Sequence, residues 1–199
     1  MALPRRGAAG IGGRRRRLGA HRLPGRRLRR YPWVAELREF TARAHRTGAR
    51  LVGICFGHQI IHTALGGEVG RAAGGWGLGI YPVAAERAFA GWSPGEPLAL
   101  LSVHRDQVLT PAPGLVRLAG GAFCPNYLFA GPGVVTVQGH PEFDHDFFSA
   151  LLPRVSEKAG DAAARQGRQA LSAVHHHDAF ATLLREFARG REILAKEAS

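Results

Sequence analysis

Residues 50–67 read RLVGICFGHQIIHTALGG and combine three local signals. The apolar run at 51–54 has the length and composition of a short buried strand, and two glycines then flank a single cysteine, Cys55. After Gly57, apolar residues recur at the spacing of one helix face, up to a Gly-Gly pair of the kind that ends helices. The order strand, tight turn, helix predicts an α/β domain.

Other segments also carry the periodicity of strands or helices. Residues 32–46 begin with a proline and have large apolar side chains at helical spacing, which predicts an amphipathic helix. Helical spacing returns after residue 142 and again near residue 180. Short apolar runs between Gly and Pro residues predict four more strands, at 79–83, 98–103, 115–118 and 134–138. The economical architecture is an open α/β sheet with helices on both faces.

The strongly basic composition comes from one end of the chain. The 199 residues have a net charge of +12, and residues 1–30 contain 11 arginines and no acidic residue. Without those arginines, 16 of the 27 basic side chains remain against 15 acidic ones, so residues 31–199 are close to neutral. We expect an Arg- and Gly-rich first segment at 1–30 that does not fold, and one domain at 31–199.

Cysteine content and hydropathy indicate a cytoplasmic protein. The two cysteines, Cys55 and Cys124, are too few for a disulfide framework. No apolar run approaches the roughly 20 residues of a membrane helix, and the N-terminus lacks the apolar core of a secretory signal. We therefore expect no membrane partner.

Cys55 has two interpretations from its own segment. A cysteine in a Gly-x-Cys-x-Gly frame between a strand and a helix is the thiol version of a nucleophile elbow, in which a tight turn exposes the nucleophile. The dipole of the following helix favours a thiolate, and the backbone N–H of Phe56 is the expected oxyanion donor. Free cysteine is also among the most buried residue types, so a structural cysteine is an equally good interpretation of this segment alone.

A second segment, VVTVQGHPEF at 134–143, favours the catalytic interpretation. A cysteine nucleophile needs a base within hydrogen-bonding reach and a third group that orients the base. His140 and Glu142 directly follow a predicted strand, and Pro141 between them is rigid enough to let the carboxylate approach the far nitrogen of the imidazole. The two segments together predict a triad of Cys55, His140 and Glu142.

The motifs GICFGHQ and QGHPEF together resemble the class I glutamine amidotransferase family, over roughly residues 31–190. Within this family, the sequence resembles stand-alone members similar to the amidotransferase domain of GMP synthase and to the γ-glutamyl peptidases. The resemblance implies a flavodoxin-like α/β fold and hydrolysis of a γ-glutamyl amide, in glutamine or a γ-glutamyl peptide, through a cysteinyl thioester. It implies a small-molecule substrate, no cofactor, no metal, and a synthase that receives ammonia as one kind of partner.

The resemblance also assigns roles to individual residues. It makes Cys55 the nucleophile, His140 the general acid and base, and Glu142 the group that orients the imidazole. Gln59 would contact the amino-acid end of the γ-glutamyl group. The residues expected to form the substrate site are Phe56, Gly57, Gln59, Ser102 and His104.

The remaining histidines and the second cysteine fit structural roles better. His58 and His62 stand four residues apart on a predicted helix, a spacing compatible with a metal, but no third ligand is evident. Three contiguous histidines at 175–177 do not project to one side and are expected in a solvated loop. Cys124 is expected in the core. We expect no metal site.

The first thirty residues depart from the family pattern. Relatives have a strand and a glycine-containing loop shortly before the helix that begins near Pro32, and this loop supplies a second oxyanion N–H; residues 1–30 show neither. Arginine codons of the CGN type, when read one base later, begin with G and can encode a series rich in Gly and Asp. We therefore expect residues 1–30 to be either a disordered segment or the product of a wrong reading frame or start site, which the nucleotide sequence decides.

Three functions follow from the sequence, and the leading one is a γ-glutamyl amide hydrolase. The first alternative is a truncated, catalytically impaired relative that acts only as a binding or regulatory module. The second is a protein that binds nucleic acid through the Arg-rich residues 1–30, with an affinity that would fall steeply as the salt concentration rises. Because the excess charge is confined to residues 1–30, we do not expect nucleic acid to be the partner.

Overall fold

The computed structural model describes residues 31–194, so the prediction of a disordered or misread segment at 1–30 lies outside the described residues. Within that range the main sheet has five strands in the order β1-β9-β8-β7-β4. Strands β1 and β9 are parallel, and the other neighbouring pairs are antiparallel, so the sheet is mixed. Its strands are β1 (Leu51–Ile54), β9 (Val134–Val137), β8 (Leu128–Gly131), β7 (Val116–Gly120) and β4 (Ala84–Ala85).

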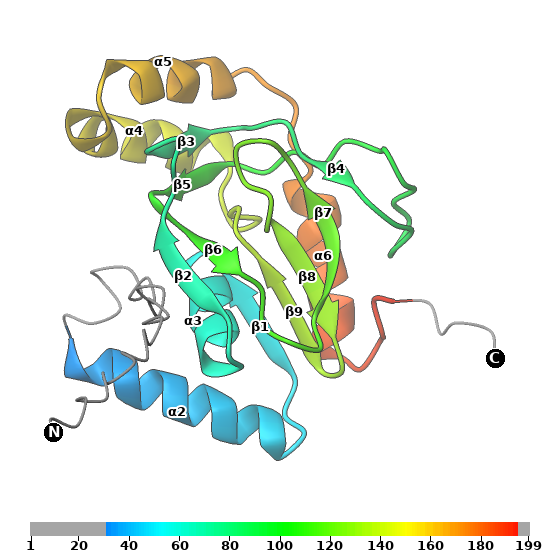
Figure 1. Cartoon of the computed structure of the whole chain (residues 1–199). Helices are drawn as coiled ribbons and strands as arrows, with labels where there is room; N and C mark the ends of the chain where they lie inside the picture. Colours follow the sequence, from blue (N-terminus) through cyan, green and yellow to red (C-terminus); the bar gives the residue numbers. More distant parts are fainter. Residues whose placement is uncertain (1–30, 195–199) are drawn as a thin grey trace, which may run out of the picture.

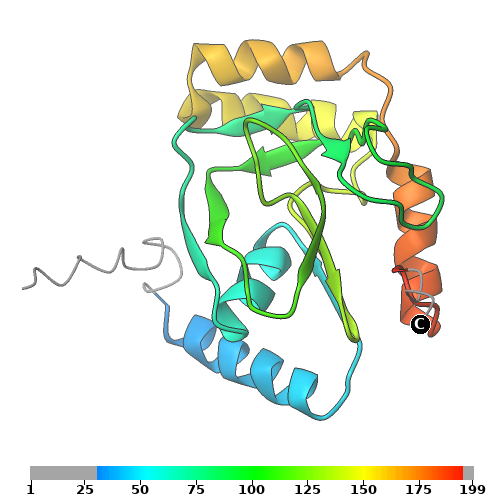
Figure 2. The same ribbon diagram turned by 45° about the vertical axis from the view of Figure 1, so that its right-hand side comes forward.

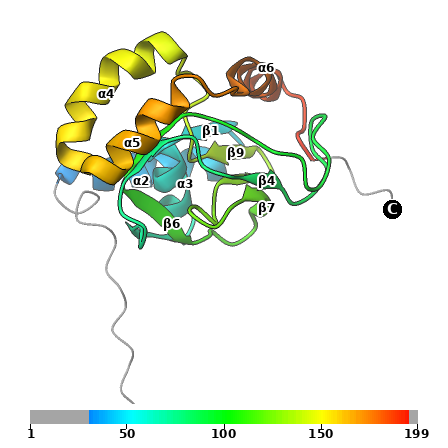
Figure 3. The same cartoon turned by 90° about the horizontal axis from the view of Figure 1, so that it is seen from above.

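Helices cover both faces of this sheet. Helices α2 and α3 lie on one side of it and α6 lies on the other (Figure 2), while α4 and α5 run side by side at one end of the molecule (Figures 1 and 3). No helix of residues 31–194 is long and apolar enough to cross a membrane. The helices are α2 (Pro32–Arg46), α3 (Phe56–Ala64), α4 (His145–Ala159), α5 (Asp161–Ala170) and α6 (His177–Ala188).

Strand β9 is buried on both faces and forms the centre of the core. Val135 and Val137 pack into the cluster that contains Phe180 of α6. Thr136 points to the opposite face, where its hydroxyl lies 3.3 Å from Nε2 of His62 in α3. A strand covered on both sides reads as a continuous apolar run, which is why residues 134–137 show no polar alternation.

Two small antiparallel ribbons complete the fold next to the main sheet. Strand β2 (Glu68–Arg71) pairs with β6 (Asp106–Thr110), and β3 (Gly77–Gly79) pairs with β5 (Ser102–His104). Helix α5 packs tightly on β3, because a Cβ on Gly79 would lie 2.9 Å from the carbonyl oxygen of Gln166. The β3–β5 ribbon lies beside α4 and α5 at one end of the molecule, whereas the β2–β6 ribbon lies beside α3 (Figure 1).

The structure confirms some predicted elements and corrects others. The predicted helix at 32–46 coincides with α2, and the predicted strand at 134–138 with β9. The strand predicted at 79–83 is wrong, because β3 ends at Gly79, whose φ of +115° breaks the extended run. The strand predicted at 98–103 is present only from Ser102 onward; the leucines before it are buried core residues outside any strand.

Candidate active site

Cys55 occupies a strained turn between the end of β1 and the start of α3. Its φ is +48° and its ψ is −99°, a left-handed conformation that costs a residue with a side chain about 1–3 kcal/mol. Its backbone N–H donates to the carbonyl of Val137 in β9, at 2.8 Å. The chain can turn this tightly because Gly53 has no side chain: a Cβ there would lie 2.8 Å from the carbonyl carbon of Gly57. A Cβ on Gly57 itself would meet open space, so close packing requires only the first of the two glycines.

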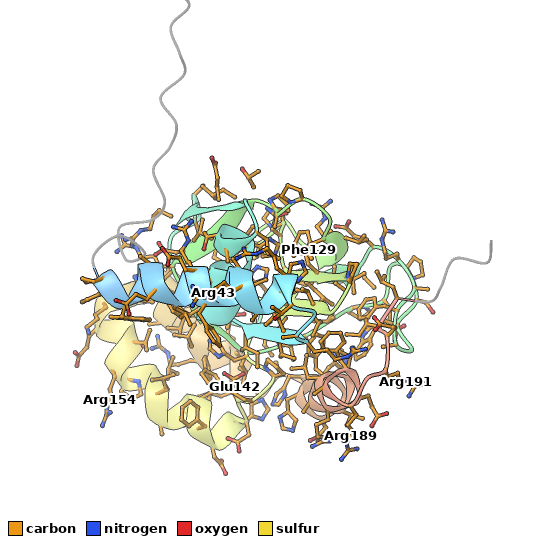
Figure 4. All side chains as sticks on the ribbon, turned by 90° about the horizontal axis from the view of Figure 1, so that it is seen from below. Arg43, Phe129, Glu142, Arg154, Arg189 and Arg191 are labelled. Atoms are coloured by element: carbon orange, nitrogen blue, oxygen red, sulfur yellow. The ribbon has the colours of Figure 1, made fainter. Side chains whose placement is uncertain are left out.

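His140 and Glu142 lie just beyond the end of β9, the parallel neighbour of β1. Because parallel strands end at the same edge of a sheet, the segments that follow β1 and β9 are brought together. The His140 backbone N–H donates to the carbonyl of Leu101 at 2.8 Å, and the ring stacks on Phe143 with centroids 4.0 Å apart. Nδ1 of His140 lies 2.7 Å from a carboxylate oxygen of Glu142, which Figure 4 labels between α2 and α4.

The charge state of His140 is set by these neighbours. Burial disfavours the imidazolium, but the adjoining Cys55 sulfur and the Glu142 carboxylate outweigh it and raise the pKa of His140 to about 9. At neutral pH the His140 ring is therefore the positively charged imidazolium. A thiol beside a protonated imidazole that is itself oriented by a carboxylate has the chemistry of a cysteine nucleophile with its general acid.

Polar groups also surround the Cys55 sulfur on its other sides. The side-chain nitrogen Nε2 of Gln138 lies 3.5 Å from Sγ, and the carbonyl oxygen of Val103 lies 3.9 Å from it. The carboxamide of Gln59 lies behind Gln138 and donates to the Oε1 of Gln138 at 3.2 Å and to the backbone carbonyl of Asp106 at 2.7 Å. The sulfur thus lies at the end of a chain of buried amides.

A cavity of about 430 Å³ opens beside Cys55. Three of the residues predicted for the substrate site, Phe56, Gln59 and His104, line it, whereas Gly57 and Ser102 do not. Ser102 is 1% exposed and lies on β5 within the protein interior. The lining residues are Cys55, Phe56, Gln59, Arg71, Trp76, Val103, His104, Arg105, Asp106 and Lys158.

Sequence reasoning missed the charged residues of this cavity. Arg71 pairs with Asp106 at 3.1 Å, whereas Arg105 and Lys158 have no carboxylate within ion-pair distance in residues 31–194. Burial and the nearby His140 lower the pKa of the remaining basic group, His104, to about 4, so it is neutral. The cavity therefore carries a net positive charge. Arg71 lies on β2, Arg105 in the turn between β5 and β6, and Lys158 on α4, and no local spacing in the sequence connects them.

A second cavity of about 550 Å³ adjoins the first. The two share Trp76, Arg105 and Lys158, so the two unpaired cations lie where the cavities meet. The stacked rings of Tyr81 and Phe123, 4.0 Å apart, line the second cavity. A ligand larger than the first cavity would extend in this direction.

The other histidines and the second cysteine lie away from the Cys55 cavity. His58 and His62 are fully buried beside Phe129, and burial lowers the pKa of both imidazoles. Cys124 is 1% exposed, and burial raises the pKa of its thiol to about 12. Among residues 31–194 no group of three or more His, Cys, Asp or Glu side chains is arranged to hold a metal ion.

The rings at 175–177 do not all point the same way. The imidazole of His175 packs against His177 and His145, at centroid distances of 4.4 Å, whereas His176 accepts a hydrogen bond from the Ala99 N–H. The divergence of His176 from its neighbours agrees with the expectation that three contiguous histidines do not project to one side, but the expected solvated loop is wrong, because all three are half-buried and His177 begins α6. This cluster lies outside the lining of the Cys55 cavity.

Comparison with known proteins gives a consistent set of relatives. The chain is 29% identical over 131 residues to a γ-glutamyl peptidase 3 of Arabidopsis thaliana, covering 62% of this chain and 53% of that protein. It is 34% identical over 130 residues to a putative glutamine amidotransferase of Saccharomyces cerevisiae, covering 63% and 52%. The chain thus spans about half the length of the curated relatives it matches. No family model matches it.

Solved structures show the same fold. A glutamine amidotransferase of Thermotoga maritima superimposes with a TM-score of 0.65 at 19% identity, covering 84% of this chain and 75% of the other. At that identity the likeness concerns the fold alone. The flavodoxin-like fold implied by the family resemblance is confirmed by this superposition, and the open α/β sheet predicted from the sequence by the mixed sheet with helices on both faces.

Proposed function

We propose that this chain, a relative of the class I glutamine amidotransferases by sequence and by fold, hydrolyses the γ-amide bond of a γ-glutamyl compound. One observation carries the proposal: the Cys55 thiol lies at a strained elbow next to a histidine that Glu142 holds in its protonated form. The relatives are described as γ-glutamyl peptidases and glutamine amidotransferases, which supports the same chemistry.

The proposed reaction has two halves. In the first, the Cys55 thiolate attacks the γ-carbonyl carbon, and the backbone N–H of Phe56 at the start of α3 receives the developing oxyanion. His140 donates its proton to the departing nitrogen as the C–N bond breaks, which leaves a γ-glutamyl thioester. In the second, neutral His140 removes a proton from water as the water attacks the thioester, and glutamate leaves as the sulfur recovers its charge.

The Cys55 cavity suits the γ-glutamyl group. The net positive charge of the cavity favours a substrate that carries a carboxylate. Gln59 lines the cavity and donates a hydrogen bond to Gln138, the residue next to the sulfur. The Nδ1 atom of His104 and the Nε1 atom of Trp76 are buried without a hydrogen-bond partner in the described residues. Polar groups of this kind become satisfied when a polar ligand enters.

A γ-glutamyl peptide fits the two adjoining cavities better than free glutamine. Glutamine occupies far less than the combined space, and its leaving group is ammonia. A peptide leaving group has a backbone and a terminal carboxylate, and the unpaired Arg105 and Lys158 lie at the passage into the second cavity. If glutamine is the substrate, a synthase that takes up the ammonia remains the predicted partner.

The test measures release of glutamate by the purified 199-residue chain from glutamine and from a γ-glutamyl dipeptide. Cys55→Ala and His140→Ala are expected to abolish turnover of both substrates, whereas Glu142→Gln retains more activity because it only orients the base. A fully active His140→Ala protein would overturn the mechanism. A clear preference for glutamine would remove the peptide assignment.

The impaired-relative alternative makes a different prediction. Loss of one oxyanion donor typically lowers turnover about 10²–10³-fold, and the second donor implied by the family resemblance falls before Pro32, outside the described residues. An impaired chain would be labelled at Cys55 by a γ-glutamyl electrophile but would release almost no glutamate. A chain with the upstream reading frame restored would then be much more active, whereas equal activity of the two chains would show that residues 1–30 are a genuine leader.

The nucleic-acid alternative is tested separately. Binding to a mixed-sequence duplex should be weak, should fall with rising salt, and should vanish in a chain that begins at residue 31. Retained binding by the shortened chain would show that residues 31–199, and not the arginines of residues 1–30, bind the nucleic acid.

A further inference from the structure

We propose that Gln138 is a further catalytic residue, whose side-chain amide donates a hydrogen bond to the Cys55 sulfur and stabilises the attacking thiolate. The catalytic part of this inference rests on the proposed function. The hydrogen bond itself can be tested on the thiol without any turnover.

The position of Gln138 follows from the register of the sheet. It is the first residue after β9, where side chains alternate between the α6 face and the α3 face. Thr136 points toward α3, so Gln138, two residues later, points the same way and reaches the elbow at the start of that helix. Its backbone N–H donates to the Tyr127 carbonyl at 2.8 Å, which holds the side chain in place. Gln138 is fully buried, and its Nε2 lies 3.5 Å from Sγ of Cys55.

The hydrogen-bond network fixes which end of the Gln138 amide faces the sulfur. The carbonyl oxygen of Asp106 only accepts, so the Gln59 group 2.7 Å from it must be the NH₂. That same NH₂ lies 3.2 Å from the outer atom of the Gln138 amide, which must therefore be the acceptor Oε1. The remaining Gln138 group, the donor NH₂, then points at Cys55. Reversing either amide would place two donors or two acceptors against each other.

The second cysteine of the chain has a different environment. The Cys124 sulfur lies 3.8 Å from the carbonyl oxygen of Asn126, which accepts from a thiol and repels a thiolate. Burial raises the pKa of this thiol to about 12. A carbonyl oxygen lies near each sulfur, that of Val103 at 3.9 Å from Cys55 and that of Asn126 at 3.8 Å from Cys124, but within residues 31–194 only Cys55 also has an amide donor, the Gln138 Nε2 at 3.5 Å. This donor favours the charged sulfur that a nucleophile requires.

The experiment measures the rate at which iodoacetamide alkylates Cys55 as a function of pH, by mass spectrometry of the peptide that contains it. In the unaltered chain the rate rises through a midpoint that marks formation of the thiolate. Gln138→Met keeps the length of the side chain and removes the donor. Because a hydrogen bond to a charged group contributes a factor of roughly ten or more, the midpoint should move upward by about one pH unit. Gln138→Glu places an acceptor at the same position and should move the midpoint at least as far.

Gln107→Met is the matched control. Gln107 is also buried, at 4% exposure, and its side-chain amide donates to the Phe123 carbonyl at 3.1 Å and not to Cys55. Loss of either buried glutamine should lower the melting temperature, but only the Gln138 variants should shift the alkylation midpoint. If both Gln138 variants fail to fold, Gln59→Met removes the group that orients the Gln138 amide and should give a smaller shift in the same direction.

The outcomes separate this inference from the proposed function. An unchanged midpoint in stable Gln138 variants, or an equal shift in Gln107→Met, would reduce Gln138 to a structural residue and overturn the inference. If the midpoint shifts but no variant and no unaltered chain releases glutamate, the hydrogen bond stands and the proposed hydrolysis fails. If both hold, the rate of glutamate release should fall at least tenfold in Gln138→Met at neutral pH.

Discussion

Cys55 and Cys124 are both cysteines of one small domain, yet they meet opposite local conditions. Cys55 is partly exposed at the first turn of α3, whereas Cys124 is buried in the cluster beneath the main sheet. A helix N-terminus and a protonated imidazole favour negative charge on sulfur, and an apolar environment opposes it. The reactivity of the two thiols toward electrophiles should therefore differ by far more than the difference in solvent exposure alone would produce.

We predict that a glutamine-analogue electrophile labels Cys55 well before Cys124. Burial raises the pKa of the Cys124 thiol to about 12, so at pH 7 almost none of it is thiolate. The extent of labelling at each cysteine, followed over time by peptide mass spectrometry in the native protein, checks this. Equal rates at the two positions, or labelling of Cys124 alone, would remove Cys55 as the nucleophile.

We predict that hydrolysis declines as the pH rises through about 9. The neighbouring sulfur and the Glu142 carboxylate hold the pKa of His140 at about 9, so the imidazolium that protonates the leaving nitrogen is present below that pH and lost above it. Glu142→Gln removes one of the two groups that raise this pKa and should move the alkaline decline to lower pH. The pH dependence of kcat/KM for both proteins is the measurement, and an unmoved decline in the variant would show that Glu142 does not control the proton on His140.

At the scale of single residues, the sequence indicates the site residues that belong to short local motifs. Cys55 was recognised from its glycine frame, and His140 and Glu142 from their position after a strand. Gln138 stands in the same QGHPE segment, but nothing in a sequence indicates which face of a strand reaches the sulfur. Arg71 and Lys158 are brought to the cavity only by the packing of β2 and α4, so no pattern in the chain pointed to them.

At the scale of elements, the crossing of β1 and α3 depends on one missing side chain. A Cβ on Gly53 would lie 2.8 Å from backbone atoms of Gly57 and from Cδ1 of Ile61, closer than real Cβ atoms pack. The strand and the helix would have to separate, and such overpacking typically costs about 1–3 kcal/mol. The same separation would displace Cys55 from His140.

We therefore predict that Gly53→Ala lowers the free energy of unfolding by about 1–3 kcal/mol and removes most Cys55 reactivity. Gly57→Ala is the matched control, because its Cβ meets open space and alanine is favoured over glycine in a helix by about 1 kcal/mol. Urea unfolding of both variants gives the comparison. Equal destabilisation by the two substitutions would show that loss of glycine flexibility, and not close packing, sets the cost.

Element boundaries were predictable where side chains alone determine them. The helix α2 was placed correctly because a proline begins it and its apolar spacing is regular. The sequence does not predict strands β2 and β6, because each is short and holds polar or charged residues among its apolar ones. The apolar run at 98–103 predicts a strand, but only its last two residues belong to β5; its leucines are buried core residues outside any strand.

At the scale of the whole molecule, two features matter: where the charged side chains lie, and which edge of the main sheet has no strand partner. The described domain is close to neutral, and several of its basic side chains, such as Arg154 on α4 and Arg189 and Arg191 after α6, point outward from the surface (Figure 4). The main sheet brings its functional residues together at one edge, where β1 and β9 end in parallel. Strand β1 itself pairs only with β9 within residues 31–194, so its second edge has no strand partner there.

An unpaired strand edge is a template for pairing with another chain, so we expect the edge of β1 that has no strand partner within residues 31–194 to promote self-association. Val52 lies on β1 and is 41% exposed. We predict that Val52→Lys lowers aggregation, because a charge on an edge strand would be buried between two paired copies. Light scattering at matched concentrations measures the effect.

Val174→Lys separates edge pairing from a general gain in solubility. Val174 is 83% exposed in the connection between α5 and α6, so it offers an equally apolar side chain away from the sheet edge. If the edge of β1 drives association, Val52→Lys should suppress scattering clearly more than Val174→Lys, and the difference should persist at high salt, where repulsion between net charges is screened. Equal suppression by the two variants would mean that added charge alone keeps the chain soluble and that the edge of β1 does not drive association.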